Sequence, residues 1–136
     1  MDPIYTAVAT SSGRDSRAVS SDGRLDVDLA LPKELGGTGE GTNPEQLLAA
    51  GWAACFSTVI DLVAKSKGMD ASDVAVTAEV SLVPHGGGFV LAATLRVEMP
   101  DHLTDAERTM LLEETHRACP YSAATRGNIA VELVLE

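Results

Sequence analysis

The sequence predicts an α+β domain in which largely antiparallel sheets surround one long apolar helix. The helix is expected over residues 43–67, where it has a clear start and a clear stop. Alternating apolar and polar residues, typical of half-buried strands, recur in three ranges: 25–31, 74–99 and 129–135. At 136 residues the chain has the usual size of one domain, so we expect a single domain over residues 1–136.

The N-terminal segment, residues 4–31, predicts a small antiparallel meander of strands. Residues 4–10 alternate weakly, and residues 18–20 and 25–31 flank a Ser-Asp-Gly turn. In the last of these, four apolar residues face one way and two aspartates face the other: Leu25, Val27, Leu29, Leu31, Asp26 and Asp28.

A glycine-rich loop, residues 32–42, connects the meander to the long helix. It contains four glycines but no Gly-Lys-Ser/Thr ending and no preceding βαβ unit, so it is not a phosphate cradle. A flexible lid, a close approach to a partner and a plain connector all remain open.

The central helix has matching signals at its two ends. Asn43 can cap the first free backbone N–H groups, Pro44 suits the first helical position, and Gln46 has capping-box spacing. Gly68 is a natural stop after Lys65 and Lys67. The helix is then about 36 Å long, at about 1.5 Å per residue.

Residues 47–56 of this helix are apolar on every side, apart from the thiol of Cys55, which predicts burial. A membrane span is not expected, because Ser57, Thr58 and Asp61 interrupt the apolar run. One sheet covers only one side of a helix, so we expect a homodimer that packs two such helices together. Gly51 costs roughly 1 kcal/mol relative to alanine, and we expect it at a helix–helix contact.

The remaining elements follow the same logic. Residues 74–99 predict a long hairpin, with its turn at residues 84–88. A capping box at residues 104–107 opens a second helix over 105–118, which ends because Pro120 disfavours helical geometry just before it. Residues 129–135 predict a final strand.

Composition and charge exclude several classes of partner. A formal charge of −10 argues against nucleic acid and against anionic lipid surfaces. The first residues contain neither a positive region nor an apolar region, so no secretory leader is expected and the protein is expected in the cytoplasm. Thiols stay reduced there, so the two cysteines are expected to be catalytic, metal-binding or inert rather than a permanent disulfide.

Cys55 and Cys119 are the residues that can carry chemistry. A cysteine in an apolar helix is often only a small hydrophobic residue. A reactive thiol must be a thiolate, and burial raises its pKa, so a positive group has to lie against Cys55. The helix itself offers none; Arg14, Arg17, Arg117 and Arg126 are the alternatives elsewhere in the chain.

Several motifs in this order resemble the organic hydroperoxide resistance (Ohr) family of the OsmC/Ohr superfamily. They occur at these positions: GRD at 13–15, PKELGG at 32–37, GTNPEQL at 41–47, AAG at 49–51, AACF at 53–56, CPYS at 119–122 and ATRGN at 124–128. The resemblance extends along nearly the whole chain and implies an intertwined homodimer with sites at the subunit interface.

The resemblance implies a thiol-dependent peroxidase. Cys55 would reduce an organic hydroperoxide to its alcohol, and Cys119 would resolve the sulfenic acid as an intramolecular disulfide. Arg14 would stabilise the thiolate and Glu45 would hold the arginine. The reductant would be an external dithiol of the dihydrolipoyl type, on a lipoylated protein or free, with no bound cofactor.

Glu45 lies ten residues before Cys55, or about 15 Å along one straight helix. The two cannot meet in one chain, whereas antiparallel central helices that cross near residues 50–51 would place Glu45 of one chain beside Cys55 of the other. An acidic residue also suits a helix N-terminus for its own sake.

An apolar pocket around the thiolate would favour fatty or aromatic hydroperoxides, and its expected residues are Leu35, Trp52, Phe56 and Tyr121. Three departures from the family pattern bear on substrate preference: Trp52 replaces tyrosine, Leu48 replaces phenylalanine and Ala123 replaces asparagine.

Three rival functions remain beside the Ohr interpretation. A metal site is not expected, because His116 and Cys119 have ligand spacing but only two local ligands, with His85 and Cys55 distant in sequence. An OsmC-like peroxidase of broader specificity is the nearest rival. A non-catalytic dimer that binds an apolar ligand is the third.

Overall fold

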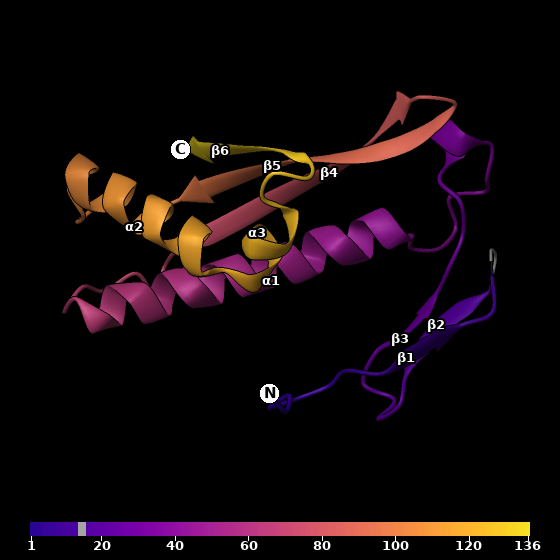
Figure 1. Ribbon diagram of the computed structural model, residues 1–136, viewed down its shortest axis with the longest axis horizontal. Coiled ribbons are helices and arrows are strands. Elements are labelled where there is room, and N and C mark those ends of the chain that lie inside the picture. Colours follow the sequence, from indigo (N-terminus) through magenta and orange to yellow (C-terminus); the bar gives the residue numbers. More distant parts are fainter. Residues whose placement is uncertain (14–15) are drawn as a thin grey trace. The chain divides into compact units, whose positions relative to one another are not determined.

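The computed structural model describes residues 1–13 and 16–136. It consists of two compact units, Met1–Leu47 and Leu48–Glu136, and the boundary between them falls inside helix α1 (Pro44–Ser66). Figure 1 shows α1 as the longest helix of the chain. The single domain over residues 1–136 stays a prediction.

The first unit contains the expected antiparallel meander, with strands in the order β1 (Ala9–Ser11), β2 (Arg17–Ser20) and β3 (Asp26–Asp28). An ion pair between Arg17 and Asp26 joins β2 to β3, with Nε to Oδ1 at 3.0 Å. The strands are shorter than expected. Residues 4–8 form no strand, because their weak alternation leaves Ile4 and Tyr5 exposed rather than packed.

The glycine-rich loop is a folded connector within this unit. Residues Lys33–Leu35 form the short 3₁₀ helix η1, which ends at Gly36 in the left-handed conformation. A Cβ on Gly37 would collide with the Leu31 backbone, and one on Gly41 would lie 2.8 Å from the Asp28 carbonyl oxygen. The close approach that the glycines permit is therefore to the end of β3 in the same unit.

The start of α1 differs in one detail from a reciprocal capping box. Asn43 caps the helix as expected, since its Oδ1 accepts from the Gln46 backbone N–H at 2.9 Å. Gln46 does not return the bond to Asn43: its Oε1 accepts from the Thr42 hydroxyl at 2.6 Å. The hydroxyl one residue earlier competes successfully for this side chain.

The end of α1 is the expected glycine stop. Gly68 has a φ of 71°, and its N–H donates to the Lys65 carbonyl at 3.1 Å. The Met69 N–H donates to the Ala64 carbonyl at 2.8 Å, which completes a Schellman motif.

The second unit is built on a three-stranded sheet in the order β4 (Ala75–His85), β5 (Gly88–Glu98) and β6 (Ala130–Leu135). The hairpin turn lies at Gly86 and Gly87, both with positive φ, as a two-residue turn requires. The pairing of β5 with β6 is parallel, an exception to the antiparallel expectation. Because two helices separate these strands in sequence, the chain can return to the same end of the sheet.

Helix α2 (Asp105–Ala118) begins with the expected capping box. The Thr104 hydroxyl accepts from the Glu107 N–H at 3.1 Å, and the Glu107 carboxylate accepts from the Thr104 N–H at 2.9 Å. Cys119 leaves the helix with an extended backbone, as the following Pro120 requires. A third helix, α3 (Pro120–Thr125), follows at once and was not expected.

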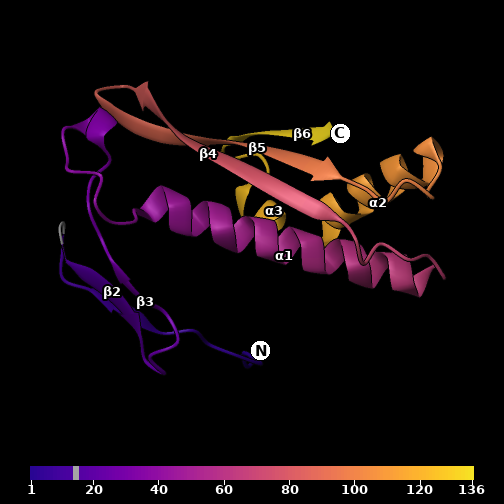
Figure 2. The same cartoon turned by 180° about the vertical axis from the view of Figure 1, so that it is seen from behind.

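The core of the second unit lies between the sheet and one side of α1, which run alongside each other in Figures 1 and 2. We call the fully buried residues of α1 its buried face: Trp52, Phe56, Ile60 and Ala64. Central strand β5 supplies their neighbours Ala93, Leu95 and Val97.

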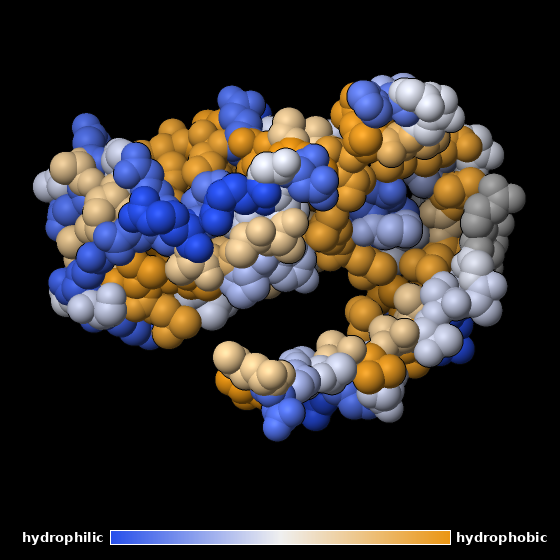
Figure 3. All heavy atoms as spheres, viewed as in Figure 1, coloured by the Kyte–Doolittle hydropathy of each residue, from blue (hydrophilic) through white to orange (hydrophobic). Residues whose placement is uncertain are grey.

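The opposite side of α1 is not buried, contrary to the expectation for a helix that is apolar all round. We call its four exposed residues the open face: Ala50, Ala54, Thr58 and Leu62. Leu62 is 60% exposed, and Figure 3 shows hydrophobic surface along this part of α1. The sheet of the second unit covers one face of the helix, and nothing else in that unit covers the open face.

By length and composition alone, α1 could cross a membrane. From the sequence we expected Ser57, Thr58 and Asp61 to exclude a membrane span. By length and composition alone, they do not exclude it. Core helices of soluble proteins pass the same test. Asp61 also pairs with Lys65 at 2.8 Å on this helix, an arrangement suited to water rather than to lipid.

Candidate functional site

The two cysteines lie side by side in the second unit. Their Sγ atoms are 3.7 Å apart, although 64 residues separate them in sequence. Both thiols are free; Cys55 is half-buried in the middle of α1, and Cys119 is fully buried between α2 and α3. A disulfide needs about 2.0 Å between the sulfurs, so a local shift closes this gap.

The sharp corner between α2 and α3 places Cys119. Its N–H donates to the Thr115 carbonyl at 2.8 Å as the last bond of α2, and its carbonyl accepts from the Ala123 N–H at 2.9 Å as the first bond of α3. Pro120 between the two helices occupies the first position of α3. Both sides of the corner are thus hydrogen-bonded, which fixes the buried thiol opposite α1.

Burial is the main influence on the ionisation of Cys55. It raises the pKa of the thiol above its ordinary value, and the hydrogen bond and charge of Cys119 raise it further. The backbone of Tyr121 acts in the opposite direction and lowers the pKa. The groups that shift this pKa include no cation from residues 1–13 or 16–136, so the described part of the chain favours the thiol over the thiolate.

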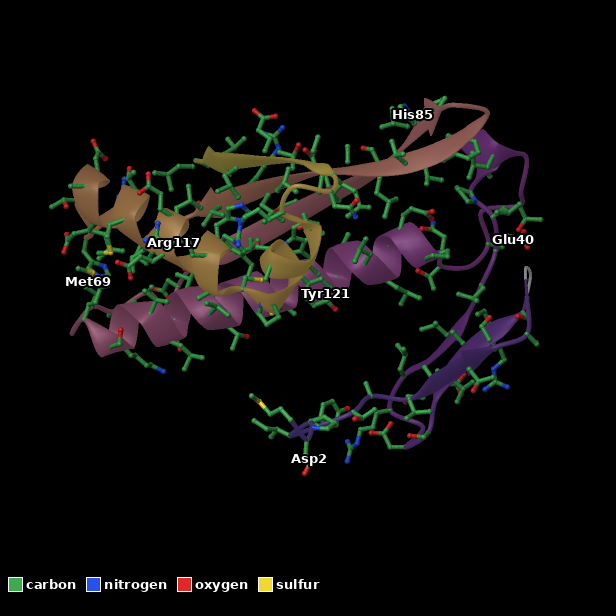
Figure 4. The ribbon with its side chains drawn as sticks, viewed as in Figure 1. Asp2, Glu40, Met69, His85, Arg117 and Tyr121 are labelled. Atoms are coloured by element: carbon green, nitrogen blue, oxygen red, sulfur yellow. The ribbon has the colours of Figure 1, made fainter. Side chains whose placement is uncertain are left out.

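The candidate arginines divide according to their contacts. Arg14 lies outside the described residues, so its role stays a prediction. Arg17 pairs with Asp26 in the first unit. Arg126 donates to the His116 carbonyl at 2.5 Å, at the end of α2, and Arg117 is exposed on α2 (Figure 4). The structure therefore gives Arg17 and Arg126 other partners.

Glu45 lies in the first turn of α1 and is half-buried. Among the described residues the structure records no ion pair for its carboxylate. Glu45 belongs to the first unit and Cys55 to the second. The hypothesis that Glu45 serves the Cys55 of a second copy stays a prediction.

The expected pocket residues are divided between the two units. Trp52 and Phe56 are fully buried in the core of the second unit. Tyr121 is half-buried and stacks on Trp52, with ring centroids 6.3 Å apart and planes inclined by 29°. Leu35 is exposed on η1 of the first unit. Their role in binding substrate stays a prediction.

The first unit contains an apolar groove of about 410 Å³. Its lining includes Leu29, Leu31 and Pro44 but none of the four expected pocket residues. Nothing in the sequence of these residues distinguishes them from ordinary strand and loop residues, so the pattern alone could not identify the groove.

Potential metal ligands do not converge in the part of the chain that the structure describes. His85 is at the tip of β4, far along the hairpin, as Figure 4 shows. Burial and the charge of Arg126 lower the pKa of His116 and so favour the neutral form of its imidazole.

Two buried hydroxyls near Cys119 were not identified from the sequence. Thr115 and Ser122 are fully buried, and their hydroxyl oxygens have no hydrogen-bond partner among the described residues. Ser122 is buried because it lies on α3. Pro120 carried a usable signal for this helix, since proline favours the first helical position.

Comparison with known proteins places this geometry in a family. A family model described as OsmC-like protein matches residues 37–134. The organic hydroperoxide resistance protein of Xanthomonas axonopodis pv. citri is 47% identical over 135 residues, which cover 97% of this chain and 94% of that protein.

Solved structures agree with this assignment. The organic hydroperoxide resistance protein from Legionella pneumophila matches with a TM-score of 0.92 and 43% identity, over 99% of each chain. OhrB of Bacillus subtilis matches with a TM-score of 0.88 and 41% identity, over 98% of this chain and 100% of that one. An OsmC-like protein from Mycoplasma pneumoniae, at 24% identity and a TM-score of 0.77, shares the fold. The chain therefore belongs to the organic hydroperoxide resistance family of the OsmC/Ohr superfamily.

Proposed function

We propose that the protein is a thiol-dependent peroxidase that reduces organic hydroperoxides to alcohols and so protects the cell against oxidative stress. The observation that carries the proposal is the cysteine pair: two free thiols 3.7 Å apart, one half-buried and one fully buried. Relatives that share more than 40% of the sequence are named for organic hydroperoxide resistance.

The first step uses the more accessible thiol. The Cys55 thiolate attacks the distal oxygen of the hydroperoxide, the O–O bond breaks, and the alkoxide takes up a proton and leaves as the alcohol. Cys55 becomes a sulfenic acid. The Cys119 sulfur then attacks the Cys55 sulfur, water leaves, and a disulfide forms. One hydroperoxide and two thiols thus give one alcohol, one water and one disulfide, and the two thiols supply both electrons.

The thiolate needs a cation, because burial and Cys119 both raise the pKa of Cys55. We assign this role to Arg14 on the basis of the family resemblance, with Glu45 orienting the guanidinium. A positive charge beside the sulfur stabilises the charged form and so opposes the effect of burial.

An external dithiol completes the cycle. One of its thiolates attacks the disulfide, and its second thiol displaces the protein thiol, so the dithiol leaves as its own disulfide. A dihydrolipoyl group, free or on a lipoylated protein, has the chemistry required. The cytoplasm, where thiols are kept reduced, is the compartment that fits this cycle.

The open face of α1 supports a homodimer as the working unit, because four adjacent exposed positions on this helix need a cover. In such a dimer Glu45 of one subunit would lie beside Cys55 of the other. This arrangement is tested by mixing two inactive variants, Glu45→Ala and Cys55→Ser, with different tags. A shared site restores activity in the mixed dimer, because one of its sites then has both residues; sites within one chain restore none.

The proposed reaction is tested by the intact mass of reduced protein after one equivalent of cumene hydroperoxide or of hydrogen peroxide. We expect the loss of two hydrogens per chain with the organic peroxide and little change with hydrogen peroxide. Cys119→Ser should instead gain oxygen at Cys55, and Cys55→Ser should not react. An equal response to both peroxides would favour an OsmC-like peroxidase of broader specificity. Unchanged mass with both would contradict the enzyme and favour a binding protein.

A further inference from the structure

Gly51 lies in the interior of α1, where glycine is the least favourable residue apart from proline. The structure shows what occupies the space of the missing side chain. A Cβ at this position would lie 2.5 Å from the Tyr121 hydroxyl oxygen, 3.2 Å from Cζ and 3.6 Å from Cε2. The end of the Tyr121 ring therefore rests directly on the helix backbone at Gly51.

Tyr121 is confined from a second direction. Its ring stacks on Trp52, which is fully buried and thus cannot move aside. Its backbone carbonyl accepts from the Thr125 hydroxyl at 2.9 Å within α3. Figure 4 shows Tyr121 where α3 lies against α1. The Tyr121 ring is therefore held in one position, over Gly51 and beside Trp52.

The position of the Tyr121 ring is linked to the cysteine pair through the short and rigid segment Cys119–Tyr121. Cys119 and Tyr121 flank Pro120, whose ring fixes its own backbone angle. On the other helix, Cys55 lies four residues after Gly51, about one turn further along α1. The segment Cys119–Tyr121 therefore faces α1 at two points: the Tyr121 ring contacts Gly51, and the Cys119 thiol faces Cys55.

We propose that Gly51 is a positioning residue for disulfide formation: by admitting the Tyr121 ring, it holds the Cys119–Tyr121 corner at the distance from which Cys119 attacks Cys55. The proposal deepens the peroxidase function proposed above and rests on it. It also gives Gly51 a role within one chain, whereas the sequence predicted a contact with a second central helix. The lowering of the Cys55 pKa by the Tyr121 backbone is consistent with the same close approach.

Three variants test the fit between the two residues. Gly51→Ala places a methyl group against the Tyr121 hydroxyl, whereas Tyr121→Phe deletes that hydroxyl and leaves the ring in place. The double variant Gly51→Ala/Tyr121→Phe removes the 2.5 Å contact with the hydroxyl and keeps the 3.2 Å contact with Cζ. Tyr121→Ala removes the ring without altering the sequence of α1.

Disulfide closure is measured with diamide, which takes two electrons from a pair of thiols and needs no peroxide. We expect Gly51→Ala and Tyr121→Ala to close about tenfold more slowly than the wild type, since a misplacement of about 1 Å can cost as much as about a hundredfold. Tyr121→Phe should close at the wild-type rate, and the double variant should recover part of the loss. Emission from Trp52, the single tryptophan, should shift in Gly51→Ala and return in the double variant.

Three results would overturn the positioning role: normal closure in Gly51→Ala, no recovery in the double variant, or an effect of Gly51→Ala on dimerisation alone. The last result would restore the contact with a second helix. A wild-type protein that ignores hydroperoxides but closes with diamide, with the expected order of variants, would contradict the peroxidase and leave the positioning role intact.

Discussion

The buried face and the open face of α1 are both mainly apolar, yet their environments are opposite. Trp52, Phe56, Ile60 and Ala64 pack against the chain's own sheet and are fully buried. Ala50, Ala54, Thr58 and Leu62, at the same four-residue spacing, remain exposed. An apolar pattern thus predicts that a face will be covered without saying which chain covers it. The cysteine that we propose as peroxidatic, Cys55, is half-buried at the edge between the two faces.

The largest effect is expected on the buried face. Phe56→Ala should lower the free energy of unfolding by about 3–5 kcal/mol, because it deletes an aromatic side chain from a closely packed core. Leu62→Ala on the open face is the matched control and should change the stability of the monomer by no more than about 0.5 kcal/mol. Urea denaturation at low protein concentration measures both. A similar loss of unfolding free energy in both variants would mean that the open face is as closely packed as the buried face.

The open face is tested by its effect on association. Leu62→Asp places a charge at one end of the open face, which we expect a second copy to cover, so the variant should sediment as a monomer at micromolar concentration, where the wild type should be a dimer. Circular dichroism should remain that of the wild type, because Leu62 is exposed in the single chain. A dimeric Leu62→Asp variant would show that the interface lies elsewhere.

The elements with strong local signals could be predicted from the sequence. The capping residues Asn43 and Thr104, the stop at Gly68 and the Gly86–Gly87 turn each act through their immediate neighbours, and each occurs where it was expected. Helix α3 was missed because it has only one turn and a half and no apolar periodicity of its own. The parallel pairing of β6 with β5 was missed because pairing depends on how the intervening helices fold back.

The candidate site also has features that the sequence predicted and features that only the structure shows. The sequence motifs identified Cys55 and Cys119, but their distance of 3.7 Å depends on how the α2–α3 corner packs against α1, which no local pattern encodes. The glycine at position 51 indicated a close approach, yet only the structure identified Tyr121 as the neighbour. Trp52 and Phe56 were expected to line a pocket, but both are fully buried in the core. The sequence could not separate the two cases, because residues that line a core and residues that line a cavity have the same helical spacing.

A smaller effect is expected at the edge between the faces. Because Cys119 raises the pKa of Cys55, Cys119→Ala should lower it, and alkylation of Cys55 by iodoacetamide should begin at lower pH than in the wild type. The rate of Cys55 alkylation is measured at each pH and divided by the rate at one fixed pH in urea, where the thiol is fully accessible. The midpoint of this ratio against pH gives the pKa of Cys55. An unchanged or higher midpoint would mean that Cys119 does not oppose ionisation of Cys55.

The smallest effect is expected at the end of α1, where Asp61 and Lys65 pair at 2.8 Å. The lysine side chain is 67% exposed, so water and salt screen the pair. Lys65→Ala should therefore lower the free energy of unfolding only slightly, and the loss should disappear in high salt. Lys67→Ala is a useful comparison because its pair, with Glu114 of α2 at 3.2 Å, joins two helices instead of two turns of one. A large loss for Lys65→Ala that persists in high salt would mean that this end of α1 is not open to water in the assembled protein. The open face would then end before Lys65.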